Sequence, residues 1–495
     1  MKMLLFSVNS KVVRNHLESP VLSGEEAAGL LVHRSISDGT PIYLDDETMM
    51  PVEPLCSWGR NMSYADLARS TLKDYGRIMA RFAGHQEGRG HDVLSATESD
   101  LVAFKRVRTQ LQGRPIGTSA WGKESGLLDQ FFGFAVDEGY LPQRPVRVAA
   151  RGRNPLAPRV RRGMDIRHLT LDQYRYFRDV GLGGQRPDSQ VDRTFRGWAP
   201  HRNRAGSDLA LGSGARWQEW ATVLLPELGI GVKPPGQAAE FTVQACAKYG
   251  KTRTVYVPED AVGSVDTYVL LERPELTAAG AGNLARRHRD LFVISRIDHE
   301  SGRVRGTLDG VLREFDMQAM PADLRRITLY EGEFGLEALT VFVCRSGLMP
   351  GADSWKRYRH AAWRRMQDQA DKTTPRLPAK RWRWHDLRHT YALQLLSYLE
   401  RVMDGEESDH AARRRRHDRY LSGHIRHNPL LIVSRRLGHA SPETTYAYLE
   451  YTDDLINEFE EAFSGWVGDT GEEATYAQIA AHAFGLEPGA LRGGQ

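Results

Sequence analysis

The stretch WHDLRHTYA, residues 384–392, carries more information about function than any other part of this chain. It places His385 and Arg388 three residues apart, and the triplet LGH follows at residues 437–439. Tyr448 comes nine residues after the histidine of that triplet. Residues three apart lie on one face of a helix, so the first histidine and the arginine can reach the same phosphate. A hydroxyl nucleophile, proton-transfer groups and fixed cations are together what phosphoryl transfer without a metal requires.

A zinc site is the main alternative for this stretch. His385 and His389 are four residues apart on a predicted helix, which superficially matches the histidine pair of an H-E-x-x-H motif. Here Asp386 stands in the glutamate position, and Arg388 lies between the histidines, where its charge disfavours a bound dication. An isolated H-x-x-R is also commonly a core histidine beside a surface charge. The companion motifs argue against both interpretations, and we expect no metal and no other cofactor.

Taken in order, the motifs resemble the C-terminal signature of the tyrosine recombinases, the phage-integrase family. His385 and Arg388 match its H-x-x-R box. His439 ends its L-G-H box, and Tyr448 stands in its T-T-x-x-Y context. The resemblance implies that Tyr448 attacks a DNA phosphate, leaving a 3′-phosphotyrosyl bond and a free 5′-hydroxyl. His385 would take the phenolic proton and His439 would orient the phosphate. Such a covalent intermediate retains the energy of the phosphodiester, so rejoining needs no ATP.

An upstream box supplies a second arginine. LALGSGARWQEW, residues 209–220, begins apolar, turns at its two glycines and resumes as a helix. It resembles the family's T-G-x-R-x-x-E box, with Ser213 in place of threonine. The resemblance implies that Arg216 is the first catalytic arginine and that Glu219 is the acid that supports the site. Arg216 and Arg388 would hold the two non-bridging phosphate oxygens as negative charge develops.

A predicted β-hairpin supplies a lysine. Two runs rich in β-branched residues, at 241–243 and 253–258, predict short strands. The turn between them contains KYGK, which resembles the family's hairpin pattern G-K-G-x-K-x-R. Alignment on the arginine that begins the second strand makes Lys248 the catalytic lysine, which would protonate the departing 5′-oxygen. Because alanine stands where the family has glycine before this lysine, Lys251 remains the alternative.

Composition agrees with a DNA-processing enzyme of the cell interior. With 495 residues, 41% hydrophobic and 26% charged, the chain has the length for two or more domains and the composition of an ordinary soluble protein. No run approaches the eighteen or so apolar residues that a membrane helix needs. Three scattered cysteines, Cys56, Cys246 and Cys344, argue for a reducing compartment and against a disulfide framework or a zinc finger. We therefore expect a cytoplasmic protein without a membrane partner.

The predicted fold is mainly α with a small antiparallel β-sheet. A helical N-terminal domain, which resembles the core-binding domain of integrases and would clamp DNA, precedes a mixed α/β catalytic domain. Apolar residues at three- and four-residue steps from residue 67 onwards predict its helices. The predicted segments are an N-terminal arm of unclear role (1–60), the core-binding domain (61–147), a basic linker (148–168), the catalytic domain (169–452) with expansions at about 287–345 and 404–427, and an acidic tail (453–495).

Basic residues gather before the catalytic domain, although the formal net charge of the whole chain is only +4. The last 44 residues contain nine acids and one base, so the rest of the chain carries +12. Prolines exclude a continuous helix in the linker region, and we expect an extended strand along DNA phosphates. A solvated linker is the alternative. The arginines expected to contact DNA are Arg144, Arg147, Arg151, Arg153, Arg159, Arg161 and Arg162.

The resemblance implies a site-specific recombinase, encoded by a mobile element, that acts as a tetramer on two double-stranded DNA sites. Accessory DNA-bending or directionality proteins are compatible with this function. Leu455, Ile456, Phe459 and Phe463 predict a one-sided apolar helix in the tail, for docking on a neighbouring protomer or on its own body. Two other functions stay open. A type IB topoisomerase would use the same residue types on one duplex, and a catalytically silent DNA-binding relative would use none of them.

Overall fold

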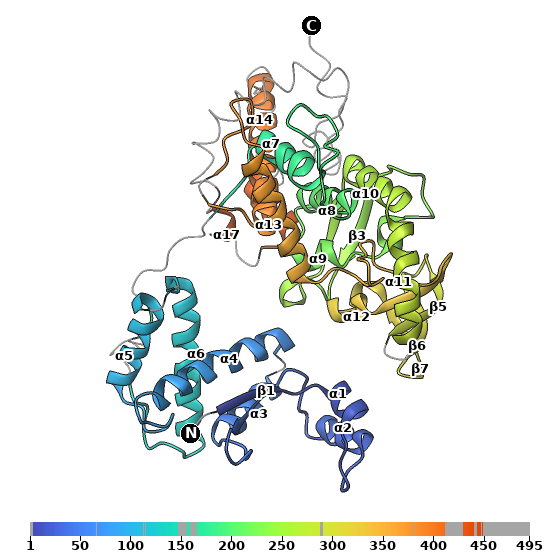
Figure 1. Ribbon diagram of the computed structural model, residues 1–495. Helices are drawn as coiled ribbons and strands as arrows, with labels where there is room; N and C mark the ends of the chain where they lie inside the picture. Colours follow the sequence, from blue (N-terminus) through green and yellow to red (C-terminus); the bar gives the residue numbers. More distant parts are fainter. Residues whose placement is uncertain are drawn as a thin grey trace. The chain divides into compact units, whose positions relative to one another are not determined.

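The computed structural model describes residues 3–65, 67–111, 113, 115–146, 156–158, 166–287, 291–378, 380–410, 429–439, 443–446 and 448. The chain divides into two compact units, Met1–Gly163 and Met164–Gln495, which are described one at a time (Figure 1). The prediction of a mainly helical chain with small sheets is confirmed. Within the described residues, no helix is long and apolar enough to cross a membrane.

The first unit combines a helical body with a two-stranded antiparallel sheet. Its elements are β1 (Met3–Ser7), α1 (Ser10–His16), α2 (Gly24–His33), β2 (Pro41–Asp45), α3 (Leu55–Tyr64), α4 (Arg69–Glu87), α5 (Glu98–Arg106) and α6 (Thr118–Asp137). Strand β1 pairs with β2 in register from Met3 opposite Asp45. The fully buried Tyr43 and Leu55 share one core with Phe82 and Phe131. Residues before position 61 therefore belong to the same hydrophobic core as the helices.

Helix α4 shows why this unit is helical. Its buried apolar residues Leu72, Met79 and Phe82 recur at steps of seven and three, which places them on one face against the core. Helices α2 and α5 begin with capping boxes, in which Ser23 and Thr97 accept hydrogen bonds from the backbone N–H three residues later. Each such cap accepts a hydrogen bond from a backbone N–H group that has no partner within the first helical turn.

The second unit is built around its own central helix, α8 (Pro200–Ser213). Its other helices are α7 (Leu171–Arg175), α9 (Trp217–Ala221), α10 (Glu259–Leu271), α11 (Arg273–Arg287), α12 (Ala322–Arg326), α13 (Ala352–Asp368), α14 (Trp384–His410), α16 (Pro429–Leu437) and α17 (Glu443–Tyr446). Helix α8 buries most of its length, and α10 and α14 both pack on it. Because α8 continues through Gly212, only Gly214 makes the turn that the sequence predicted at both glycines.

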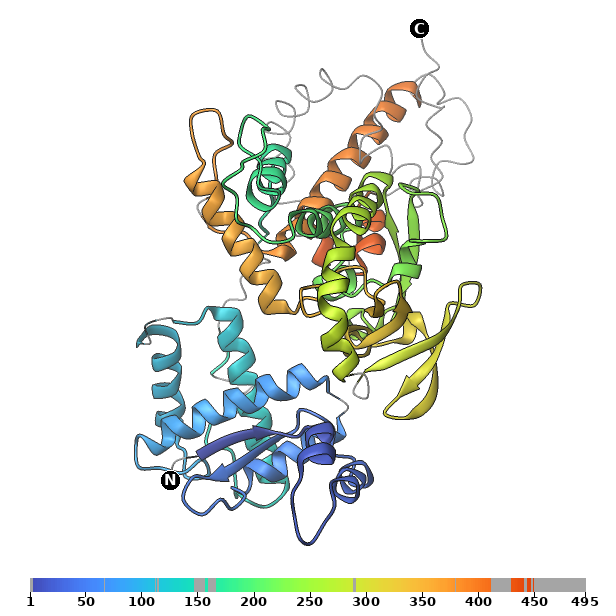
Figure 2. The same cartoon turned by 45° about the vertical axis from the view of Figure 1, so that its right-hand side comes forward.

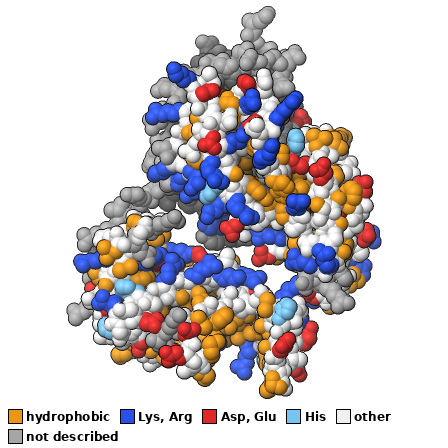
Figure 3. Space-filling view, viewed as in Figure 1, with side chains coloured by type: hydrophobic (Ala, Val, Ile, Leu, Met, Phe, Trp, Pro, Cys, Tyr) orange, Lys and Arg blue, Asp and Glu red, His pale blue; other side chains and the backbone are white. Residues whose placement is uncertain are grey.

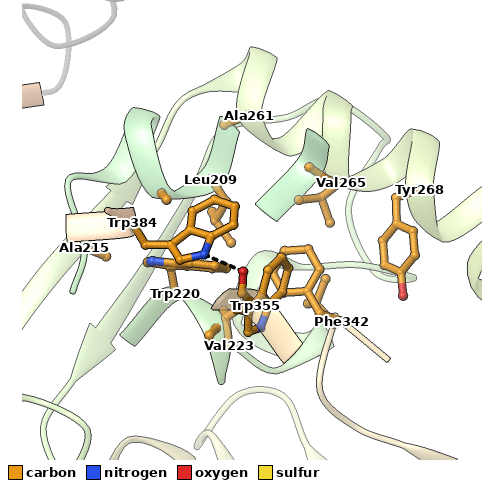
Figure 4. Close-up of a cluster of buried hydrophobic side chains, with 14 of the residues drawn as sticks. Leu209, Ala215, Trp220, Val223, Ala261, Val265, Tyr268, Phe342, Trp355 and Trp384 are labelled. Carbon is orange, nitrogen blue, oxygen red and sulfur yellow. Dashed lines mark hydrogen bonds between the residues drawn. The ribbon is translucent and has the colours of Figure 1, made fainter. Parts of the chain in front are cut away.

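An aromatic cluster anchors the start of α14. The indole rings of Trp220, Trp355 and Trp384 meet edge-on or tilted, with centroids 4.9–5.4 Å apart (Figure 4). The Trp384 indole N–H also donates to the backbone carbonyl of Trp355 at 2.9 Å. Removing one such buried tryptophan typically costs about 3–5 kcal/mol. The residue that precedes His385 is therefore fixed in the core.

Both predicted strands of the lysine hairpin are present, as β3 (Ala239–Val243) and β4 (Arg253–Val257), and they pair antiparallel. The first predicted expansion forms a further sheet in the order β7-β6-β5-β8-β9, in which β5 and β8 run parallel (Figure 2). Its strands are β5 (Phe292–Asp298), β6 (Arg303–Leu308), β7 (Val311–Asp316), β8 (Thr328–Gly332) and β9 (Gly335–Ala338).

The sequence of the first expansion predicts a hairpin turn at residues 300–303 and a strand at residues 339–343. The turn does join two paired strands of this sheet, β5 and β6. The predicted strand at 339–343 does not form. Strand β9 ends at Ala338, and Thr340 makes only a single bridge to Leu224. Leu339, Val341 and Phe342 are nevertheless buried, so the apolar run reflects burial in the core and not a strand.

Candidate active site

Helix α14 carries three side chains of the candidate site on consecutive turns. Arg388 and His389 are buried, with 3% of each exposed, whereas His385 lies at the surface. The imidazole rings of His385 and His389 are 4.8 Å apart, edge to face. The backbone N–H of Arg383 donates to the Asp386 carboxylate at 2.7 Å, which satisfies a donor just before the helix begins. The helix thus fixes the order and spacing of the histidines and the arginine.

Arg388 is held by backbone carbonyls from two other helices. Its guanidinium donates to the carbonyl of Gly214 at 2.7 Å, at the end of α8, and to the carbonyl of Leu437, at the end of α16. Gly214 adopts a φ of +59°, and a Cβ there would lie 2.3 Å from the Tyr391 ring, so glycine is required. Burial, followed by the charges of Arg216 and Arg253, lowers the pKa of Arg388 to about 9. The guanidinium remains charged at neutral pH.

Glu219 joins two arginines beside Arg388. Its carboxylate accepts from Arg216, through the backbone N–H at 2.6 Å and the guanidinium at 3.3 Å. It also accepts two hydrogen bonds from Arg253, one of them at 2.8 Å. Burial alone would raise the pKa of Glu219, but Arg253 and Arg216 hold it below its ordinary value. Arg216 further donates to the carbonyl of Gly438 at 3.3 Å, next to His439.

The L-G-H segment and the tyrosine meet in the same place. His439 Nδ1 pairs with the Thr445 hydroxyl at 2.8 Å, and Thr445 O accepts from the Tyr448 backbone N–H at 3.0 Å. The rings of His439 and Tyr448 lie parallel, 6.1 Å apart. Tyr448 is 1% exposed, and its hydroxyl lies 2.9 Å from Nδ1 of His389. Sequence reasoning treated His389 only as half of a zinc pair, and no motif box marked it.

The surroundings keep the histidines neutral. Removal from water, then the charges of Arg388 and Arg216, lowers the pKa of His439 to about 3. The same causes lower the pKa of His385, although its side chain is exposed on one side and packed against His389 on the other. Burial lowers the pKa of His389 to about 3. Burial also raises the pKa of Tyr448 to about 12, against smaller opposing effects of the two arginines. At neutral pH the site therefore combines neutral imidazoles and a neutral phenol with charged guanidinium groups and the ionised carboxylate of Glu219.

The lysine candidates lie on the hairpin turn. Lys248 begins a short 3₁₀ turn (Lys248–Gly250), and both Lys248 and Lys251 are exposed. Strand β4 is tied to the site through its first residue, because Arg253 binds Glu219 and also donates to the Arg436 carbonyl at 3.3 Å. In the sequence Arg253 served only to align the hairpin. Its anchoring role follows from the fold.

Of the arginines predicted to contact DNA near the linker, the structure describes one. Arg144 pairs with Asp129 at 2.9 Å at the surface of the first unit. Arg147, Arg151, Arg153, Arg159, Arg161 and Arg162 lie outside the described residues, as do the arginine run at 413–416 and the tail from 453 onwards.

A basic row on α4, which the sequence analysis missed, is visible in Figure 3. Arg69, Lys73, Arg77 and Arg81 recur every four residues, which is the spacing of one helix face. Arg69 lies 3.7 Å from Asp38 and Arg81 lies 3.8 Å from Glu124. Among the described residues, Lys73 and Arg77 have no acidic partner. Both line a pocket at strand β1, which gives the first unit its own cationic surface.

Over the described ranges, no group of three or more His, Cys, Asp or Glu side chains is arranged to hold a metal ion. The positive charges gathered in the site belong to the guanidinium groups of Arg216, Arg253 and Arg388. Such groups hold a phosphate through several directed donors, which is the chemistry that a metal ion otherwise supplies in phosphoryl transfer.

The chain is similar to curated tyrosine recombinases. It is 30% identical over 224 residues to the tyrosine recombinase XerD of two strains of Mycobacterium tuberculosis, CDC 1551 / Oshkosh and ATCC 25618 / H37Rv. The match covers 44% of this chain and 65% of each relative, slightly less than two thirds of their length. No protein-family model matches the chain.

The chain also aligns with two solved structures, both at a low TM-score. One is the Tn1549 transposon integrase in complex with circular intermediate DNA, with a TM-score of 0.41, 12% identity, and coverage of 86% of this chain and 97% of that chain. The other is the XerH site-specific recombinase bound to a palindromic difH substrate, with a TM-score of 0.41, 14% identity, and coverage of 84% and 83%.

Proposed function

We propose that this chain, whose similarity to curated relatives supports the tyrosine recombinase family, is a site-specific DNA recombinase. It cleaves and rejoins DNA through a 3′-phosphotyrosyl intermediate. One observation carries the proposal: a buried tyrosine hydroxyl lies in a site that also contains two arginines fixed by backbone carbonyls and a carboxylate. Arg216, Arg388 and Tyr448 come from the start of α9, from α14 and from the segment after α17, so only the fold brings them together.

The proposed cleavage step uses each group once. Tyr448 Oη attacks the scissile phosphorus, and its proton passes to His385. As the bond from phosphorus to the 5′-oxygen breaks, Lys248 gives that oxygen a proton, with Lys251 as the alternative donor on the same hairpin. The same groups act in reverse when a 5′-hydroxyl attacks the phosphotyrosyl bond.

The arginines stabilise the transition state. Arg216 and Arg388 hold the two non-bridging oxygens, and His439 donates a further hydrogen bond. Because their donors are already oriented by Glu219, Gly214 and Leu437, little reorganisation is needed when charge develops. Glu219 supports the clamp without touching DNA.

The proposed substrate is double-stranded DNA carrying two recombination sites, bound by a tetramer in the cytoplasm. The basic row on α4 supports DNA contact by the first unit, because lysine and arginine side chains on one face can follow a phosphate backbone. We propose the linker arginines as further phosphate contacts and a mobile element as the source of the gene. A type IB topoisomerase activity is separated from recombination by comparing plasmid relaxation with exchange between two sites.

Tyr448→Phe tests the proposal directly. The probe is a nicked duplex built from sequences that the wild-type protein enriches from a randomised pool. The wild type should form a slowly migrating covalent adduct with the labelled strand, whereas the variant should form none while DNA affinity changes less than about twofold, because base and phosphate contacts lie elsewhere. A covalent band from the variant would reassign the nucleophile, with Tyr451 and Tyr446 as the next candidates.

A further inference from the structure

His389 is the residue that contacts the hydroxyl of Tyr448, and the cleavage step described above does not use it. Nδ1 of His389 and Oη of Tyr448 are 2.9 Å apart, and the two rings are tilted with centroids 5.8 Å apart. Both side chains are almost wholly removed from solvent. A contact of this length between two buried polar groups is a hydrogen bond, because leaving either group without a partner would be costly.

The direction of this hydrogen bond follows from the chemistry of the two groups. At neutral pH a buried phenol keeps its proton, so Oη donates. The imidazole is neutral and accepts at Nδ1, which places its own hydrogen on Nε2. A neutral phenol that donates to a neutral acceptor is held in position but is not yet a strong nucleophile.

The partners of Tyr448 attach it to the site at both ends. Its backbone N–H is bonded to Thr445, whose hydroxyl pairs with His439. Its hydroxyl is bonded to His389, which directly follows Arg388 on α14. Apolar side chains, among them Leu396 and Val433, surround the ring. The nucleophilic oxygen is therefore placed by the same helix that presents one of the two phosphate-binding arginines.

We propose that His389 is a positioning residue for the nucleophile, which accepts the phenolic hydrogen bond and sets the place of Tyr448 Oη relative to Arg388. The proposal rests on Tyr448 being the nucleophile, as stated under the proposed function. It differs from the role given to His385, which takes the proton once DNA is bound. Since His389 only has to accept a hydrogen bond, another acceptor at the position of Nδ1 should replace it.

Two substitutions separate positioning from a general structural role. In His389→Asn the amide oxygen can stand where Nδ1 stands, whereas His389→Leu fills a similar volume without an acceptor. On the nicked duplex described above, His389→Leu should form the covalent adduct at least tenfold more slowly, with DNA affinity within about twofold of the wild type. His389→Asn should cleave within about threefold of the wild-type rate and keep the wild-type pH profile.

Two outcomes overturn the proposal. Cleavage by His389→Leu at the wild-type rate shows that the contact is not needed, and equal slowing in both variants shows that a hydrogen-bond acceptor is not what the site requires. If the wild type itself forms no adduct, the proposed function fails instead. The contact itself is tested independently of the cleavage rate. In folded Tyr448→Phe protein with nitrogen-15-labelled histidine, the Nδ1 resonance of His389 should move to the position of an imidazole nitrogen that accepts no hydrogen bond. An unmoved resonance also overturns the proposal.

Discussion

At the scale of single residues, neutral histidines close to fixed cations dominate the site. His385, His389 and His439 lie among Arg216 and Arg388, and all three have lowered pKa values. An imidazole that is neutral in the folded chain but charged in the unfolded chain lowers the free energy of unfolding as the pH falls. The bound phosphate would reverse part of this effect, because its negative charge favours protonated imidazole. The arrangement of cations and neutral imidazoles therefore favours the binding of an anion.

The sign of the pH dependence follows from His389. Its pKa falls from 6.5 to about 3 on folding, so between these values the unfolded chain binds more protons and acid favours unfolding. The contribution of His389 to the free energy of unfolding should be constant above about pH 7 and should decrease as the pH falls from about 6.5 towards 3. At pH 5 the contribution of this one buried group is on the order of 2 kcal/mol.

Urea unfolding at pH 7.5 and pH 5.0 measures this effect. Between the two pH values, the free energy of unfolding should decrease by up to about 2 kcal/mol less in His389→Asn than in the wild type, because asparagine cannot be protonated. His299→Asn, at an exposed position, serves as the matched control and should behave as the wild type does. Parallel curves for all three proteins would show that His389 titrates normally in the folded chain.

At the scale of elements, the first expansion supports the lysine hairpin through the turn that follows β7. The Ala245 backbone N–H donates to Gln318 O at 3.1 Å, and the Cys246 thiol lies 3.6 Å from Met320 O. These hydrogen bonds end two residues before Lys248. Arg325 organises the accepting turn by donating to the carbonyls of Met317 and Met320, at 2.6 and 3.1 Å. The expansion thus contacts the loop that leads into the candidate general acid.

Arg325→Met should destabilise the protein strongly. Arg325 is 1% exposed and binds both carboxylate oxygens of Glu227, at 2.7 and 2.8 Å. Its removal leaves a buried carboxylate without its counter-ion, which typically costs about 3–5 kcal/mol. Adding Glu227→Gln removes the charge while keeping an acceptor for the Leu224 N–H, and should recover most of the loss. Urea unfolding of both variants measures this, and a loss below about 1 kcal/mol for the single variant contradicts the argument.

The basic row on α4 should contribute to the salt dependence of DNA binding. The double variant Lys73→Ala, Arg77→Ala should bind duplex DNA more weakly, and the slope of log affinity against log salt should fall by about 2, one for each lost phosphate contact. Cleavage at saturating protein should be unchanged. The matched control is Arg296→Ala with Arg305→Ala, which removes two exposed cations from strands β5 and β6. An unaltered salt slope in the α4 variant would remove this helix from the DNA interface.

At the scale of the whole molecule, the two units divide the proposed work. The candidate active site belongs entirely to the second unit, while the α4 row belongs to the first. The acidic tail lies outside the described residues, so its role rests on the sequence pattern alone. Its predicted apolar stripe needs a groove, and the acids around it would resist a DNA surface.

Deletion of residues 453–495 separates docking on a neighbouring protomer from docking on the same chain. In the first case single-site cleavage stays measurable while recombination between two sites is impaired, which is the result we expect. Light scattering on a two-site DNA complex and thermal melting of the free protein are measured together. A tetramer that survives the deletion, combined with a lower melting temperature, would show that the tail packs on its own body.

The helical class, the hairpin and the candidate motif residues could be predicted from the sequence, because helix-face spacing and short boxes are local properties. The spacing within WHDLRHTYA is enough to place His385 and Arg388 on one helix face. The strand predicted at 339–343 was wrong because a short apolar run does not distinguish strand from buried loop.

Which groups are in contact could not be predicted from the sequence and follows from the fold. Arg253 reaches Glu219, Arg388 reaches the carbonyls of two other helices, and His389 reaches Tyr448 across 59 positions of sequence. None of these contacts leaves a periodic signal, because each depends on how separate helices pack. The identity of the residues is local information, but the distance between a hydroxyl and its acceptor is a property of the folded chain.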